Sequence, residues 1–116
     1  RNKQGSFLLW VDQETILKDK ATQWKGYYLH PFEKGDMDVE FTFKSDGTLT
    51  GKGTDPHGSF TLEGKHDNFK TFNFIKKMDK DANWTINYKG SFTEGTVIEG
   101  KYTIEMLTDV FKFWLV

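Results

Sequence analysis

The sequence has no cysteine among its 116 residues, so disulfides and thiolate chemistry are absent. This favours an intracellular or organellar protein slightly, but many secreted domains also lack cysteine, so the compartment stays open. It also lacks any apolar run near the roughly 20 residues of a membrane-spanning helix, so we expect no direct membrane insertion. Neither sign of charge dominates, because 16 basic and 17 acidic residues are interspersed and give a net charge of −1. A chain without a basic field does not attract nucleic acid. Since it starts at Arg1 and shows no signal-peptide pattern, we expect a processed chain or an excised fragment.

Aromatic residues are abundant instead. They make up 16% of the sequence, with 11 Phe and 4 Trp, beside a charged fraction of 28%. This composition predicts a folded chain with a ring-rich core and argues against disorder. The length suits one domain and leaves no room for a second core.

The stretch Met37–Gly64 has the clearest local pattern. Phe41 and Phe43 alternate with polar residues, which is the period of two of a half-buried strand. Asp46-Gly47 follows, and its Gly supplies the positive φ that a tight hairpin needs. The cluster from Asp55 to Gly58 predicts a second turn, in which Asp55 bonds to its own backbone. The pattern therefore predicts three strands and two turns.

The same pattern extends in both directions and predicts eight strands joined by short turns. The predicted strands are Trp24–Leu29, Met37–Lys44, Thr48–Gly53, Gly58–Gly64, Phe69–Lys76, Trp84–Ser91, Thr96–Glu105 and Val110–Val116. Polar loops are predicted from His30 to Asp36 and from Lys77 to Asn83. Connections this short exclude parallel crossovers, so we predict an all-β fold, an eight-stranded antiparallel up-and-down meander that closes into a barrel. A two-sheet sandwich is the alternative.

Residues 1–23 differ from the rest and are expected to form an N-terminal arm, separate from the barrel domain at 24–116. The apolar run Phe7–Val11 predicts a short strand or extended segment. Asp12 then begins about two helical turns that bury Ile16 and Leu17. We expect this strand and helix segment to close one mouth of the barrel or to contact a neighbour.

Several short motifs resemble the meander of avidin/streptavidin-type, or calycin-type, barrels. They are W-x-G-Y-Y at Trp24–Tyr28, D-G-x-L-x-G at Asp46–Gly51 and I-x-G-x-Y at Ile98–Tyr102. The resemblance covers residues 24–116 and implies an up-and-down β-barrel. It implies no binding residues, because avidins surround their ligand with Asn, Ser, Tyr and Asp side chains, whereas the inward positions here are bulky and apolar.

The inward register predicts a filled interior without ionisable groups. Its members are Val39, Phe41, Phe43, Leu49, Phe60, Leu62, Phe72, Phe74, Ile86, Ile98, Ile104 and Phe113. Catalysis needs ionisable groups in a desolvated pocket, so we expect no catalytic residues and no enzyme. His30, His57 and His66 have no metal-ligand spacing, so we expect neither a metal nor another cofactor.

Two functions fit this pattern. The first is a non-catalytic interaction module or accessory subunit of a larger assembly, since Tyr27, Trp114 and Phe69 fall in the outward register. Its protein partner would contact Tyr27, Trp114 and four residues of the arm, Phe7, Leu8, Trp10 and Val11. The alternative is a carrier of a small apolar ligand, like avidins or lipocalins, in which Tyr28, Trp84, Tyr88 and Tyr102 would line the barrel mouth.

Overall fold

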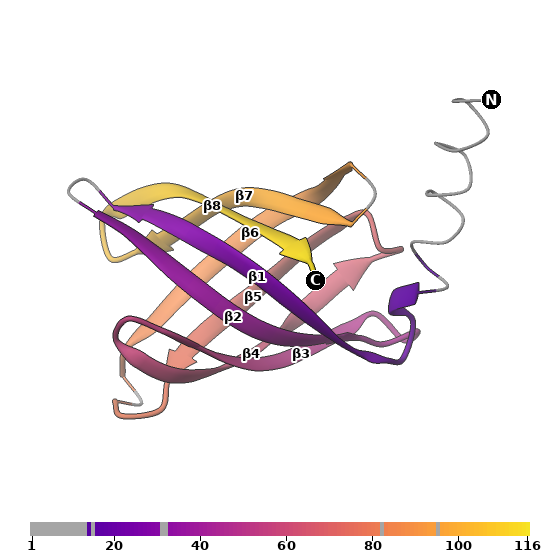
Figure 1. Cartoon of the computed structure of the whole chain (residues 1–116), viewed down its shortest axis with the longest axis horizontal. Coiled ribbons are helices and arrows are strands. Elements are labelled where there is room, and N and C mark those ends of the chain that lie inside the picture. The colour runs from indigo at the N-terminus through magenta and orange to yellow at the C-terminus, as the bar shows by residue number, and fades with distance from the viewer. Residues whose placement is uncertain (1–13, 15, 31–32, 82, 95) are drawn as a thin grey trace.

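The structure, a computed structural model, describes residues 14, 16–30, 33–81, 83–94 and 96–116. Eight antiparallel strands follow one another around a closed barrel, and β8 is hydrogen-bonded back to β1 (Figure 1). The strands are β1 (Ala21–His30), β2 (Glu33–Phe43), β3 (Thr48–Asp55), β4 (Gly58–Asp67), β5 (Thr71–Met78), β6 (Thr85–Glu94), β7 (Val97–Ile104) and β8 (Leu107–Leu115). The predicted up-and-down barrel is confirmed, and a two-sheet sandwich is excluded. No helix in this described part of the chain is long and apolar enough to cross a membrane.

Side chains alternate between the interior and the outer face along each strand, because successive residues of a strand point to opposite faces. Of the residues predicted to point inward, Ile104 is partly buried and the others are buried. The rings pack closely in the middle of the barrel. Phe74 stacks on Tyr88 with ring centroids 4.8 Å apart, and Phe41 meets Phe113 edge-on at 5.3 Å. This central part of the lumen is filled, as the sequence predicted.

The two ends of the barrel differ. Strands β1, β3, β5 and β7 finish at one end of the barrel and begin at the other (Figure 1). At that second end Leu17 is fully buried and belongs to the same core as Trp24 and Phe43. Trp24 and Phe43 both face Phe92, at ring distances of 6.4 and 5.6 Å. This end is therefore closed by apolar side chains.

Backbone bonds fix Leu17 in place. Lys18 pairs with Phe43, and the amide of Asp19 donates to the carbonyl of Phe43 at 2.8 Å. Leu17 is buried as predicted, whereas Ile16 is exposed, contrary to the prediction. A single helical turn places adjacent residues about 100° apart, so only one of the two can point into the barrel end. The expected arm residues 1–13 lie outside the described residues, so the division into arm and barrel stays a prediction.

The predicted loop from His30 to Asp36 is wrong over residues 33–36, which belong to β2. The register of β1 with β2 continues to the pair His30↔Glu33. Lys34 and Asp36 are exposed while Gly35 and Met37 are buried, so the alternation persists through a segment whose polar composition suggested a turn. Similarly, β1 begins at Ala21 rather than Trp24, because Ala21 still pairs with Thr42.

Phe69 was predicted to begin a strand and to point outward, and both predictions are wrong. It lies in the turn between β4 and β5, where Asn68 and Phe69 have φ values of 50° and 57°. The Phe69 amide donates to Nδ1 of His66 at 3.2 Å, and the ring is buried against the His66 ring at 4.4 Å. Left-handed backbone at two consecutive residues ends the strand and turns this ring inward.

Candidate functional site

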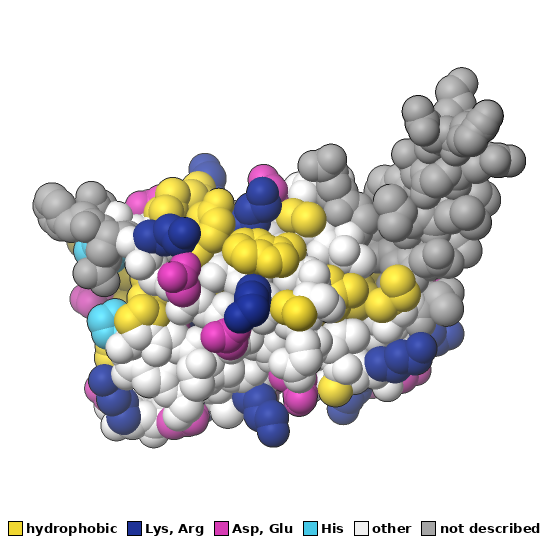
Figure 2. All heavy atoms as spheres, in the orientation of Figure 1, with side chains coloured by type: hydrophobic (Ala, Val, Ile, Leu, Met, Phe, Trp, Pro, Cys, Tyr) yellow, Lys and Arg dark blue, Asp and Glu magenta, His cyan; other side chains and the backbone are white. Residues whose placement is uncertain are grey.

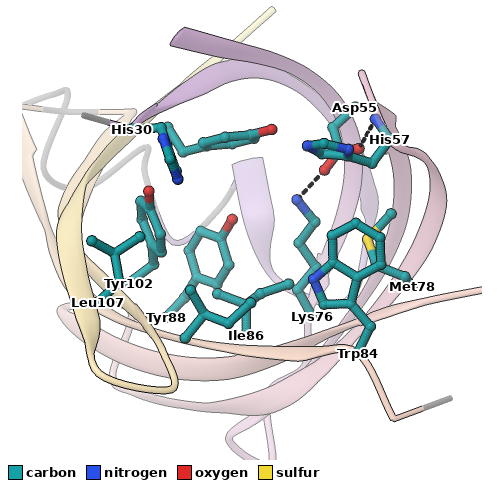
Figure 3. Close-up of a pocket in the computed structure, with 12 residues that line it drawn as sticks. His30, Asp55, His57, Lys76, Met78, Trp84, Ile86, Tyr88, Tyr102 and Leu107 are labelled. Carbon is teal, nitrogen blue, oxygen red and sulfur yellow. Dashed lines mark hydrogen bonds and ion pairs between the residues drawn. The ribbon is translucent and has the colours of Figure 1, made fainter. Parts of the chain in front are cut away.

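A cavity of about 260 Å³ lies at the end of the barrel opposite Leu17 (Figure 3). His30 at the end of β1, His57 after β3, Trp84 after β5 and Leu107 after β7 all belong to its lining. Its lining consists of Tyr28, His30, Asp55, His57, Lys76, Met78, Trp84, Ile86, Tyr88, Tyr102, Ile104 and Leu107. Apolar and aromatic side chains predominate, with few polar groups among them. That is the usual composition of a small-molecule site, although the volume is below the common range of about 300–1,000 Å³.

An ion pair is buried in the cavity wall. Nζ of Lys76 bonds to Oδ2 of Asp55, and the two side chains are only 3% and 1% exposed (Figure 3). The expectation that no ionisable group points inward is therefore wrong. A buried charge is costly unless it is paired, so each of these side chains depends on the other.

The sequence places both members of the pair by simple rules. Lys76 follows Phe72 and Phe74 at intervals of two, so the pleat of β5 directs it into the barrel. Asp55 ends β3, where its Oδ1 accepts the His57 amide at 2.7 Å, which is the predicted Asx-type bond. That bond leaves Oδ2 for Lys76. The end of β3 thus supplies the anion and β5 supplies the cation.

Aromatic rings surround the ammonium group. Nζ of Lys76 lies 4.4 Å from the ring centroid of Phe60, 5.1 Å from that of Tyr28 and 5.9 Å from that of Tyr88. The negative faces of such rings favour a cation. Burial lowers the pKa of Lys76 from its ordinary value, and the hydrogen bond and charge of Asp55 oppose that change.

Three tyrosines form the other side of the cavity. The Tyr102 ring lies 5.8 Å from the rings of both Tyr28 and Tyr88. The Tyr102 hydroxyl donates to the backbone carbonyl of Leu29, one residue beyond the last β1–β8 pair at Tyr28. Tyr102 therefore links β7 to β1 by a side-chain hydrogen bond at the cavity mouth. The Tyr88 hydroxyl lies deeper, 3.9 Å from Sδ of Met37. Burial first, then the negative charge of Asp55, raises the pKa of Tyr88 well above its ordinary value, so it remains a neutral donor.

A glycine sets the position of the Tyr28 ring. Gly35 pairs with Tyr28 across β1 and β2, and a Cβ atom built on Gly35 would lie 2.0 Å from Cζ of that ring. The ring therefore lies directly on the bare backbone of β2. Any other residue at this position would displace Tyr28 and change the shape of the cavity wall.

The structure brings the four predicted ligand-binding residues together. Tyr28, Trp84, Tyr88 and Tyr102 all line the one cavity, from β1, the turn after β5, β6 and β7. Trp84 lies at the rim, where its ring contacts His57 at 5.2 Å and Nζ of Lys80 lies 5.5 Å above it. Lys76 and Asp55 were not among the predicted site residues. Strict alternation along Phe72, Phe74 and Met78 was a signal for Lys76.

Two of the predicted partner-contact residues, Tyr27 and Trp114, are separated from this cavity. Tyr27 and Trp114 lie on the outer face, on β1 and β8, with ring centroids 6.2 Å apart. Figure 2 shows hydrophobic side chains spread over this face, with charged side chains between them. Nζ of Lys34 lies 5.1 Å from the Tyr27 ring, and Lys25 pairs with Asp38 at 2.7 Å. The other four predicted contact residues, Phe7, Leu8, Trp10 and Val11, lie outside the described residues.

The three histidines lie at the two ends of the barrel. His66 is buried at the closed end, where Nδ1 accepts the Phe69 amide and Nε2 donates to the carbonyl of Lys44 at 2.6 Å. His30 and His57 lie at the mouth of the cavity. Among the residues that the structure describes, no three His, Cys, Asp or Glu side chains are grouped so that they could hold a metal ion.

Comparisons with known proteins support the fold only. No family model matches the sequence, and no curated protein matches it. A solved structure that is similar to this chain is a de novo designed fluorescence-activating β-barrel, with a TM-score of 0.60 and 9% sequence identity. The alignment covers 84% of this chain and 94% of the designed one. It supports a β-barrel and gives no specific support to an avidin-like or calycin-like relationship.

Proposed function

We propose that this protein binds a small, mainly apolar ligand in the cavity at the mouth of the barrel, without catalysing a reaction on it. The observation that carries the proposal is the convergence of Tyr28, Trp84, Tyr88 and Tyr102 on one cavity that also holds a buried ion pair. A ring-lined wall with few polar groups favours a flat apolar molecule and fixes its orientation. The role resembles that of avidin-like or lipocalin-like carriers, while the ligand-facing residues are this chain's own.

The asymmetry of the lumen supports the proposal. At the closed end Leu17 and the rings of Trp24, Phe43 and Phe92 fill the interior. At the open end the lining is equally rich in rings, yet about 260 Å³ stays unfilled. Protein interiors are ordinarily packed to the density of organic crystals, and empty space in an apolar wall forfeits contact energy. A ligand of matching size would restore those contacts.

A pair of matched substitutions tests this proposal. Ile86 lines the cavity, whereas Ile75 points outward from the neighbouring strand and is 46% exposed. We expect the full chain to bind 2-ethylnaphthalene, a purely apolar bicyclic probe, with one-to-one stoichiometry. Ile86→Phe should weaken that binding, because the bulkier ring occupies part of the cavity, and Ile75→Phe should leave it unchanged. Equal binding to both variants, or no binding to the parent chain, would contradict the proposal.

A second candidate function is a protein-interaction module that uses the outer face of β1 and β8. It is favoured by the adjacent rings of Tyr27 and Trp114, of which Trp114 is 37% exposed, because isolated barrels keep the outer face polar. Native mass spectrometry of the chain from its own source separates the two functions. A stoichiometric protein adduct that Trp114→Ser removes would support the interaction module. A small-molecule adduct that Trp114→Ser retains would support the carrier.

A further inference from the structure

Two buried donors in the cavity wall share one poor acceptor. Sδ of Met37 lies 3.7 Å from Nζ of Lys76 and 3.9 Å from the hydroxyl oxygen of Tyr88. Within the described part of the chain, this thioether is the only hydrogen-bond partner of the Tyr88 hydroxyl, and Lys76 has only Asp55 besides it. A thioether sulfur is a weak acceptor, while Lys76 and Tyr88 are both strong donors. Apart from the bond between Lys76 and Asp55, the wall therefore offers hydrogen bonds that the protein itself satisfies poorly.

The charges in the cavity restrict which ligand group can accept those bonds. Lys76 and Asp55 together are neutral, and both are buried. A ligand carboxylate would add an unpaired negative charge close to Asp55, and a ligand ammonium would add a positive charge close to Lys76. Either charge would lose its hydration without gaining a partner of its own. A neutral acceptor has no such penalty.

We propose that the ligand carries a neutral carbonyl oxygen, which lies between Nζ of Lys76 and the hydroxyl of Tyr88 and takes the place of Met37 Sδ as their acceptor. This inference rests on the proposed carrier function and specifies the chemistry of its ligand. The apolar part of the ligand would lie toward the mouth, against Trp84, Ile86 and Leu107, which line the same cavity (Figure 3). The ammonium group keeps Asp55 as its counterion throughout.

Matched probes test the head group. We would measure, by calorimetry on the full chain, the binding of 2-acetonaphthone, 2-naphthoate, 2-naphthylmethylamine and 2-ethylnaphthalene, which share one ring system. The ketone should bind about tenfold more tightly than 2-ethylnaphthalene, as expected for up to two net hydrogen bonds. The carboxylate and the ammonium should bind more weakly than the ketone. Tighter binding of either ion, or equal affinity for the ketone and 2-ethylnaphthalene, would overturn the inference.

Three variants separate the donors from the rest of the cavity. Tyr88→Phe should lower the affinity for the ketone about three- to tenfold and leave that for 2-ethylnaphthalene unchanged. Tyr27→Phe is the matched control, because it removes a hydroxyl from the outer face. Met37→Leu conserves volume and removes the thioether, so the preference for the ketone should persist or increase. A Tyr88→Phe variant that loses affinity for both probes equally would refute the hydrogen bond.

The two proposals fail in different ways. If 2-ethylnaphthalene and the ketone both fail to bind the parent chain, the carrier function is wrong, and the carbonyl inference falls with it. If both probes bind with equal affinity and Ile86→Phe weakens the binding of both, the carrier function holds and only the carbonyl inference is wrong.

Discussion

Replacing one member of the buried ion pair should destabilise the barrel more than any exposed substitution. In Lys76→Met the aliphatic part of the side chain is nearly conserved, but Asp55 keeps a carboxylate that is 1% exposed and has lost its cation. Breaking a buried pair in this way costs about 3–5 kcal/mol. The Phe60 ring 4.4 Å from Nζ also loses its cation, which adds about 0.5–2 kcal/mol. We therefore expect the free energy of unfolding to fall by about as much as the whole stability of a marginally stable domain, which is about 5 kcal/mol.

Urea unfolding at pH 7, followed by far-UV circular dichroism, measures the effect. The double variant Lys76→Met with Asp55→Asn removes both charges and retains an oxygen that can accept the His57 amide, so its stability should recover to within about 2 kcal/mol of the parent. Lys76→Met on its own should be much the less stable of the two. A Lys76→Met chain as stable as the parent would refute the reasoning, because Asp55 would then not be a charge that depends on Lys76.

Asp55→Asn should lower the free energy of unfolding less at pH 9 than at pH 7. Burial lowers the pKa of Lys76, so as the pH rises the unpaired amine loses its proton in the folded chain before it does so in the unfolded chain. Urea unfolding at both pH values measures this difference. Above about pH 10 the free energy of unfolding of the parent should fall by about 1.4 kcal/mol per pH unit relative to that of Tyr88→Phe, since the raised pKa of Tyr88 keeps the phenol protonated only in the folded chain. Thermal unfolding of both chains across pH 10–12 measures the difference. Gly35→Ala should cost about 1–3 kcal/mol and abolish probe binding, because the added Cβ lies 2.0 Å from the Tyr28 ring; retained binding would contradict the role given to this ring. Leu17→Ala should cost about 2–5 kcal/mol and leave probe binding intact, because Leu17 is buried at the opposite end; loss of binding without loss of stability would contradict the separation of the two ends.

The alternating pattern of the strands accounts for most of the fold. Val39, Phe41 and Phe43 are buried in β2 because a strand buries every second residue, and the closed order of eight strands follows from turns too short for crossovers. The pattern failed where composition and register disagree. Residues 33–36 look like a loop because they are polar and contain a glycine, but partner strand β1 extends alongside them and provides their hydrogen bonds.

The candidate site was less predictable because its key residues depend on long-range register. The aromatic side chains at the mouth could be named from their inward positions, and they do line one cavity. Lys76 was missed because a lysine usually indicates the solvent side of a strand. Its burial depends on Asp55, which is 21 residues away in the sequence, at the end of β3. No local pattern contains that pairing.

The buried ion pair distinguishes the mouth of the barrel from the closed end, which apolar side chains fill. Replacing a buried ion pair with apolar residues of similar volume is often neutral or stabilising, so stability alone gives no reason for Lys76 and Asp55 to occupy the barrel interior. The closed end, with Leu17 and Trp24, shows that this chain can seal a barrel mouth with apolar side chains. Donors aimed into an unfilled cavity make sense if a ligand uses them. A double variant, Lys76→Met with Asp55→Leu, should therefore stay within about 2 kcal/mol of the parent, although it loses the acceptor of the His57 amide. Its preference for 2-acetonaphthone over 2-ethylnaphthalene should be smaller, because only the Tyr88 donor remains. If the preference were undiminished in a stable double variant, the pair would have no part in recognition, and Tyr88 would remain as the donor to test.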